Sequence, residues 1–129
     1  MKIERRSCER FSVPGSTISY RSQGLFSRFR SRPPESHPML DLSKGGLSFL
    51  TDRRPRLGEK LSLLVSCPDW SSPILVSGKV VYVGGSPVRS YKYRIGFQFN
   101  PYGPEKGRNS LESLNRLDEL EKTYVPRQS

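Results

Sequence analysis

The segment YKYRIGFQF, residues 91–99, carries the clearest structural signal in the chain. Its large apolar side chains alternate with polar residues or glycine, and they are Tyr91, Tyr93, Ile95, Phe97 and Phe99. Successive side chains of a β-strand point to opposite faces, so a period of two places all five on one face. The segment is therefore predicted to be a half-buried antiparallel strand.

Shorter apolar segments upstream of this strand predict the rest of a sheet. They cover residues 11–20 around a turn or bulge at Pro14-Gly15, and residues 39–43, 46–51, 61–66 and 74–83. Turn residues separate them, which is typical of strands in a small all-β fold. We predict a mainly β fold, a small six-stranded antiparallel β-barrel over residues 12–100. Residues 21–38 are basic, rich in Ser and Pro and without periodicity, and predict a long loop with His37 exposed.

Downstream of the strand, the pattern changes to that of a helix. Pro101, Gly103 and Pro104 end the sheet, and Asn109 followed by Glu112 resembles a capping box. Leucines then recur every three residues and form an apolar stripe of Leu111, Leu114, Leu117 and Leu120. The prediction is a C-terminal α-helix over residues 105–124 and a tail at 126–129. The stripe is expected to pack on the sheet or on a partner subunit, which leaves a homodimer through this helix as an alternative.

The composition limits the classes of protein that fit. The chain has 129 residues, suited to one domain over residues 1–125, and contains no apolar run of the roughly 20 residues that span a bilayer. Residues 1–10 lack the apolar stretch of a secretory signal, so a cytoplasmic location is expected. Two cysteines and one histidine cannot build a four-ligand zinc site. Without a carboxylate pair or an activated nucleophile, we expect no catalytic residues, no metal, no cofactor and no enzymatic activity.

The charge points to an anionic partner. The formal net charge is +10, and 15 of the 22 basic residues are Arg. Residues 1–60 hold 13 basic and 6 acidic side chains, a net charge of +7. The guanidinium group is a planar, permanently charged fork that grips a phosphate or a guanine edge at two points. The alternative is a well-solvated basic surface that binds nothing in particular.

Two short motifs carry a resemblance to a known family. Arg6 and Arg10 form an R-x-x-x-R pair directly ahead of the first predicted strand, and DLSKGG at residues 41–46 forms D-x-S-x-x-G between two strands. In this order, and followed by YRIGFQF, they resemble the PilZ domain, the bacterial receptor module for cyclic di-GMP. The resemblance covers roughly residues 5–122. A second R-x-x-x-R pair, Arg28 and Arg32, lies in the predicted loop, where the family does not have it.

The resemblance implies a ligand site with two sides. Residues 1–11 become a flexible ligand-binding arm, whose Arg6 and Arg10 can contact guanine edges, guanine faces and phosphates. Asp41 can accept from the two neighbouring donors of guanine, N1–H and the exocyclic amine, and Ser43 can donate to the ligand. Gly46 is expected to give the turn a positive φ or a close backbone approach to the ligand. Turn chemistry alone would also favour Asp, Ser and Gly in such a turn.

An additional arginine, Arg5, directly precedes the motif. In the family, such an arginine accompanies binding of two intercalated cyclic di-GMP molecules, so two ligands per chain are expected here. Arg89 and Arg94 could add to an anionic site, although exposed strand arginines are usually solvated. Cys8 is interpreted as a bystander within the arm, and Trp70 as a core or loop plug.

The prediction for function is a non-catalytic receptor in which the arm closes over cyclic di-GMP and the change is signalled to a partner protein. Two alternatives stay open. One is a small basic barrel that binds RNA or single-stranded DNA, although Asp41 would then repel a phosphate backbone. The other is a PilZ-like adaptor that binds no nucleotide, against which both motifs count.

Overall fold

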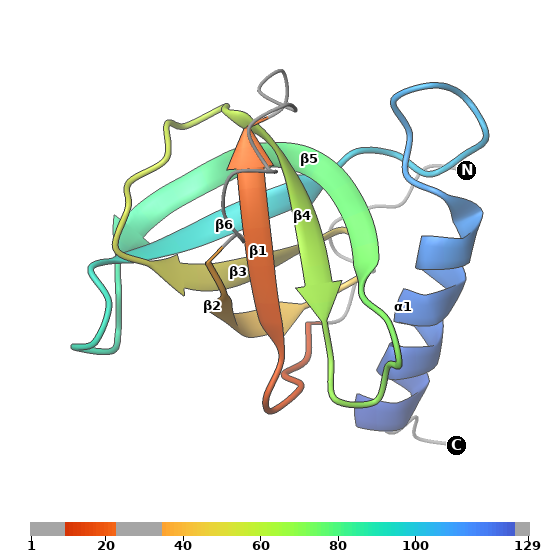
Figure 1. Cartoon of the computed structure of the whole chain (residues 1–129), viewed down its shortest axis with the longest axis horizontal. Coiled ribbons are helices and arrows are strands. Elements are labelled where there is room, and N and C mark those ends of the chain that lie inside the picture. Colours follow the sequence, from red (N-terminus) through yellow and green to blue (C-terminus); the bar gives the residue numbers. More distant parts are fainter. Residues whose placement is uncertain (1–9, 23–34, 126–129) are drawn as a thin grey trace.

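The computed structural model describes residues 10–22 and 35–125, and the predictions for Arg5, Arg6, Cys8, the Arg28–Arg32 pair and the tail lie outside them. Within this part of the chain there are six strands and one helix: β1 Thr17–Ser22, β2 His37–Leu42, β3 Gly46–Thr51, β4 Lys60–Ser66, β5 Ile74–Gly85, β6 Tyr93–Phe99 and α1 Leu111–Tyr124. The strands form a closed antiparallel barrel in the order β1-β2-β3-β6-β5-β4 (Figure 1). The predicted fold class is confirmed.

The predicted alternation along β6 fills the barrel with three of its five residues, whereas Tyr91 lies ahead of the strand and Tyr93 is only partly buried. Ile95, Phe97 and Phe99 are buried, and Phe97 meets Phe99 edge to face with ring centroids 6.0 Å apart. β6 lies between β3 and β5, where both neighbours pair with it along nearly its whole length. The two long ladders cover the inward face of β6 from Ile95 to Phe99, which explains the strength of its pattern in the sequence.

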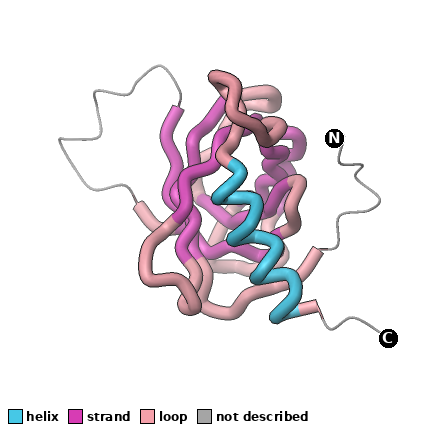
Figure 2. Tube along the Cα trace, turned by 90° about the vertical axis from the view of Figure 1, so that its right-hand side faces the viewer, coloured by secondary structure: helices cyan, strands magenta, loops and turns pink. Residues whose placement is uncertain are grey.

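The helix α1 lies against the outside of the barrel (Figure 2). Leu117 and Leu120 are 1% and 3% exposed and join the core, whereas Leu111 is 54% exposed. The stripe of four leucines is thus only partly the buried face, which also includes Ser113 and Glu121. This face follows spacings of three and four residues, as the 3.6-residue period of a helix requires. The structure contains no second chain, so the homodimer through this helix stays a prediction.

The start of α1 differs from the sequence expectation. The helix begins at Leu111 and not near residue 105, and its N-cap is Ser110, whose hydroxyl accepts from the Ser113 amide at 3.1 Å. Asn109 is instead 4% exposed and bonded to β5: its side chain accepts from the Ser77 amide at 2.7 Å and donates to the Ser77 carbonyl at 3.0 Å. Asn109 therefore joins the helix to the barrel and does not cap it.

The predicted loop at residues 21–38 is shorter in the structure, and the prediction that His37 is exposed is wrong. Strand β1 extends to Ser22, and His37 begins β2 and is 8% exposed, with its ring 5.1 Å from the Tyr20 ring and 6.2 Å from the Phe49 ring. Burial lowers the pKa of His37, against an opposing effect of the nearby Glu35 carboxylate. The prediction for Trp70 is confirmed: it packs against the core, with the Arg116 guanidinium 4.6 Å above its ring.

Candidate functional site

The candidate site is centred on the carboxylate of Asp41, near the end of β2. Arg10 Nη1 lies 2.8 Å from Asp41 Oδ1, and Arg94 Nη2 lies 3.7 Å from Asp41 Oδ2. The Ser48 hydroxyl donates to Oδ1 at 2.9 Å. The arginine side chains are 53% and 43% exposed and Asp41 is 21% exposed, so the charges are open to a ligand from solvent. Arg10 and Asp41, assigned from different motifs, are thus brought together.

Strand register explains why Ser48 and Arg94 join Asp41. Asp41 pairs with Ser48 across β2 and β3, and Ser48 pairs with Gly96 across β3 and β6. Arg94 precedes Gly96 by two residues on β6 and therefore shares its face of the sheet. Sequence reasoning gave Ser48 no role and ranked Arg94 low, because these neighbours are fixed by pairing between strands that are distant in the chain.

The same row of cross-strand neighbours continues to Tyr82. Gly96 pairs with Tyr82 of β5, and a Cβ atom at Gly96 would come within 2.9 Å of the Tyr82 Cβ. The tyrosine is 51% exposed. The glycine therefore leaves room for Tyr82 next to the strand carrying Arg94, and the row runs from a carboxylate to an open aromatic side chain. Aromatic rings of this kind are surfaces on which nucleobases stack.

The base of the N-terminal arm is fastened directly to the site. The Phe11 amide donates to the Leu42 carbonyl at 3.0 Å, and the Leu42 amide donates back to the Phe11 carbonyl at 2.8 Å. The Ser12 hydroxyl donates to the Leu40 carbonyl at 3.0 Å. Because Leu42 directly follows Asp41, this pairing holds Arg10 beside the carboxylate.

The turn at residues 43–46, which we call the binding turn, is internally bonded. The Ser43 hydroxyl donates to the Gly46 carbonyl at 3.3 Å and accepts from the Gly45 amide at 3.1 Å. Ser43 is 3% exposed. In this conformation the Ser43 hydroxyl is therefore not available to a ligand, and its contact with a ligand stays a prediction.

Glycine is required at position 46 by strand packing, which the sequence alone did not indicate. Gly46 is not among the glycines of positive φ in the described residues, so that part of the expectation is wrong. A Cβ atom at this position would lie 2.3 Å from the backbone carbonyl oxygen of Phe97 in β6. The close approach that requires glycine is thus between β3 and β6, at the last residue of the binding turn, where β3 begins.

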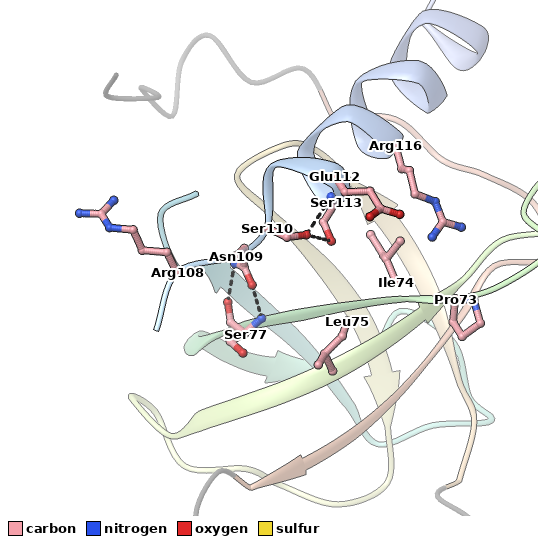
Figure 3. Close-up of a pocket in the computed structure, with 10 residues that line it drawn as sticks. All are labelled: Pro73, Ile74, Leu75, Ser77, Arg108, Asn109, Ser110, Glu112, Ser113 and Arg116. Carbon is pink, nitrogen blue, oxygen red and sulfur yellow. Dashed lines mark hydrogen bonds between the residues drawn. The ribbon is translucent and has the colours of Figure 1, made fainter. Parts of the chain in front are cut away.

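A cavity of about 370 Å³ lies elsewhere, between β5 and the start of α1 (Figure 3). Figure 3 shows Asn109 bonded to Ser77 within its wall, with Arg116 and Glu112 at the helix side. None of the residues predicted for the ligand lines this cavity. The charge cluster at Asp41, and not the cavity, is therefore the candidate site.

The described residues contain neither a cluster of metal ligands nor a helix suited to a membrane. Over residues 10–22 and 35–125, no group of three or more His, Cys, Asp and Glu side chains lies together in a way that could hold a metal ion. In the same ranges, no helix is both long enough and apolar enough to span a membrane.

Fold and site together define a six-stranded barrel domain with an arginine–carboxylate cluster where the arm meets β2. The family model described as "PilZ domain" matches residues 4–116, and the chain therefore belongs to the PilZ domain family. No curated protein matches the sequence.

Several solved structures share the fold at low identity. The chain is similar to the inhibitor of motility MotI/DgrA of Bacillus subtilis, with 16% identity, a TM-score of 0.66, and coverage of 98% of this chain and 55% of that one. It is similar to Escherichia coli YcgR in complex with c-di-GMP, with 16% identity, a TM-score of 0.65, and coverage of 94% and 46%. The PilZ domain of YcgR with c-di-GMP gives 14% identity, a TM-score of 0.56, and coverage of 93% and 96%. The chain thus spans about half the length of the first two proteins.

Proposed function

We propose that this chain is a non-catalytic cytoplasmic receptor for cyclic di-GMP, which it binds through the cluster at Asp41. The observation that carries the proposal is the 2.8 Å ion pair between Arg10 and Asp41, which joins the R-x-x-x-R and D-x-S-x-x-G motifs at one point. Membership of the PilZ family and the likeness to the YcgR structures with c-di-GMP support it.

The chemistry of the cluster suits a guanine dinucleotide. The carboxylate of Asp41 can accept from guanine N1–H and the exocyclic amine, and the guanidinium groups of Arg10 and Arg94 can grip O6 and N7 or a phosphate. Tyr82, on the same row of the sheet, offers a ring for stacking. Arg5 and Arg6 would add charge and stacking surface from the arm. With Arg5 present, we propose two intercalated ligands per chain.

Binding would exchange partners at Asp41. In this structure, Arg10 donates to the carboxylate that guanine would use. A ligand that takes over Asp41 frees Arg10 to contact the ligand itself, so the arm changes its surroundings on binding. Such an exchange alters the surface that a partner protein meets, which is how a receptor without a catalytic site can signal.

Isothermal titration with cyclic di-GMP tests the proposal. We expect the wild-type chain to bind with two ligands per chain. Arg10→Ala and Asp41→Ala should each weaken binding by about 10- to 100-fold, the equivalent of one charge-assisted hydrogen bond of about 1.5–3 kcal/mol. Arg94→Ala should weaken it less, because its distance to Asp41 is longer.

The control is Arg56→Ala, which removes the same charge from an exposed residue in the β3–β4 connection. Circular dichroism would establish that each variant is folded. Equal affinity of wild type, Arg10→Ala and Asp41→Ala would contradict the proposed site, and an absence of binding by the wild type would favour the adaptor alternative.

Single-stranded nucleic acid is the second candidate ligand, favoured by the net charge of +10. The carboxylate in the middle of the cluster argues against it, since a phosphate backbone would be repelled there. Displacement of fluorescently labelled cyclic di-GMP by an RNA or DNA oligonucleotide at equal concentration would reverse this preference.

A further inference from the structure

The binding turn is attached to helix α1 through the side chain of Lys44. Lys44 Nζ lies 3.4 Å from Asp118 Oδ1 and 3.5 Å from Glu121 Oε1. These side chains are 26%, 32% and 12% exposed, so the pairs are better shielded than ordinary surface ion pairs. The pair joins the D-x-S-x-x-G motif to an element 74 residues away in the chain.

The base of the arm contacts the same part of the helix. The ring of Phe11, the residue after Arg10, lies parallel to the ring of Tyr124, with a centroid distance of 6.4 Å and an interplanar angle of 6°. The Tyr124 hydroxyl is fixed in turn by donating to Asp69 Oδ2 at 2.8 Å. Both chain segments that hold the candidate site therefore meet the second half of α1, residues 118–124.

Lys44 is fixed through its main chain as well as its side chain. Besides the ion pairs of its ammonium, its carbonyl accepts from the Tyr102 hydroxyl at 2.6 Å. In this conformation, which we call closed, the Ser43 hydroxyl is bonded within the turn and buried. For Ser43 to donate to a ligand, the turn has to open, and opening works against the contact between Lys44 and α1.

Of the two carboxylates, Glu121 relies on Lys44, whereas Asp118 is also paired with Lys122, whose Nζ lies 3.3 Å from Asp118 Oδ2. Glu121 is 9% exposed, and its Oε1 has no hydrogen-bond partner, so the ammonium 3.5 Å away is what offsets its burial. An anionic ligand near the binding turn competes with these two carboxylates for Lys44. Opening of the turn and the charge of the ligand would thus both weaken the contact between Lys44 and α1.

We propose that the ion pairs of Lys44 with Asp118 and Glu121 hold the binding turn in a closed state of lower ligand affinity, so that ligand binding and docking of the second half of α1 oppose each other. The inference rests on the proposed function and names its regulation. Because coupling between two sites is reciprocal, a ligand that opens the turn also loosens the helix end.

The test neutralises the carboxylates without changing their shape, in the double variant Asp118→Asn, Glu121→Gln. We expect cyclic di-GMP to bind this variant about five- to tenfold more tightly than the wild type, within the usual range of coupling between sites. Glu119→Gln, which removes the same charge from an exposed position of α1, should leave the affinity unchanged. In a Lys44→Met background, the double substitution should no longer increase affinity. An increase that persists without Lys44 would assign the effect to general electrostatics and overturn the proposal.

A second measurement needs no ligand. Amide hydrogen exchange of Ser43 and Gly45, which are bonded within the turn, should be faster in the double variant than in the wild type, with β5 and β6 unchanged. Unchanged exchange in the turn overturns the proposal whether or not nucleotide binds. A wild type that binds no cyclic di-GMP instead overturns the proposed function, so the two failures are distinguishable.

Discussion

One carboxylate, Asp41, collects donors from three separate parts of the chain: the arm, β3 and β6. The residues of this cluster show how far a sequence can predict a site. Arg10 and Asp41 could be assigned because each belongs to a short motif at a recognisable place relative to a strand. Ser48 and Arg94 could not, because their nearness to Asp41 depends on register between strands, and a shift of one residue would turn both to the other face.

His37 is a residue whose position gives a pH dependence. Its burial lowers the pKa of the imidazole below the ordinary value of 6.5, so the unfolded chain takes up a proton at higher pH than the folded one. The contribution of His37 to the free energy of unfolding should therefore be complete above about pH 6.5. It should be lost as the pH falls from about 6.5 to the lowered pKa of the folded chain. Denaturant unfolding between about pH 7.5 and 5 measures this slope.

The matched variant is His37→Phe, which keeps an aromatic ring beside Tyr20 and Phe49 and removes the titrating group. We expect a flatter profile over the same interval. Carboxylates contribute mainly below about pH 5 and affect both proteins alike. An identical slope in variant and wild type would assign the dependence to other groups.

At the scale of elements, β3 and β6 approach so closely that Gly46 leaves no room for a side chain. Gly46→Ala would place a methyl group 2.3 Å from the Phe97 carbonyl oxygen, which is backbone and cannot rotate away. We expect the free energy of unfolding to drop by about 2 kcal/mol or more, as in other overpacked sites. Thermal and urea unfolding would measure the loss.

Gly85→Ala is the control, since a Cβ atom there meets nothing within 4 Å. It should change stability by less than about 1 kcal/mol. If Gly46→Ala were as stable as the wild type yet bound no nucleotide, Gly46 would have a direct role at the ligand and the structural explanation would be wrong.

The limits of sequence reasoning at this scale appear in the helix. Period and composition predicted α1 and its C-terminal end, because these depend on residues close together in the chain. The cap was assigned to Asn109 and not to Ser110, because local pattern favours an Asn as an N-cap, whereas here its amide pairs with Ser77, 32 residues earlier. Local preference gave way to a bond between distant residues.

At the scale of the whole molecule, the ladders between neighbouring strands of the barrel differ in length. Among the residues that the structure describes, β1 pairs with β4 over six residue pairs and with β2 over two, whereas β5 and β6 pair over seven. We expect the amides of β1 and β2 to exchange with solvent faster than those of β5 and β6, as measured by NMR on the ligand-free chain, because a short ladder opens at lower cost. Equal protection in all four strands would show that the barrel opens only as one unit.

The two ends of α1 are attached to the barrel in different ways. Ahead of its first turn, the Asn109 amide bonds to Ser77 as a neighbouring strand would, while the far end is held by side chains: the Lys44 ion pairs, the Phe11 ring, the Tyr124–Asp69 bond and buried Leu120. With 14 residues, the helix is about 21 Å long, so its far end lies well away from the asparagine. A tilt of the helix by about 10° would displace its far end by about 4 Å. Such geometry would amplify a small rearrangement beneath that end into a movement that another molecule can detect.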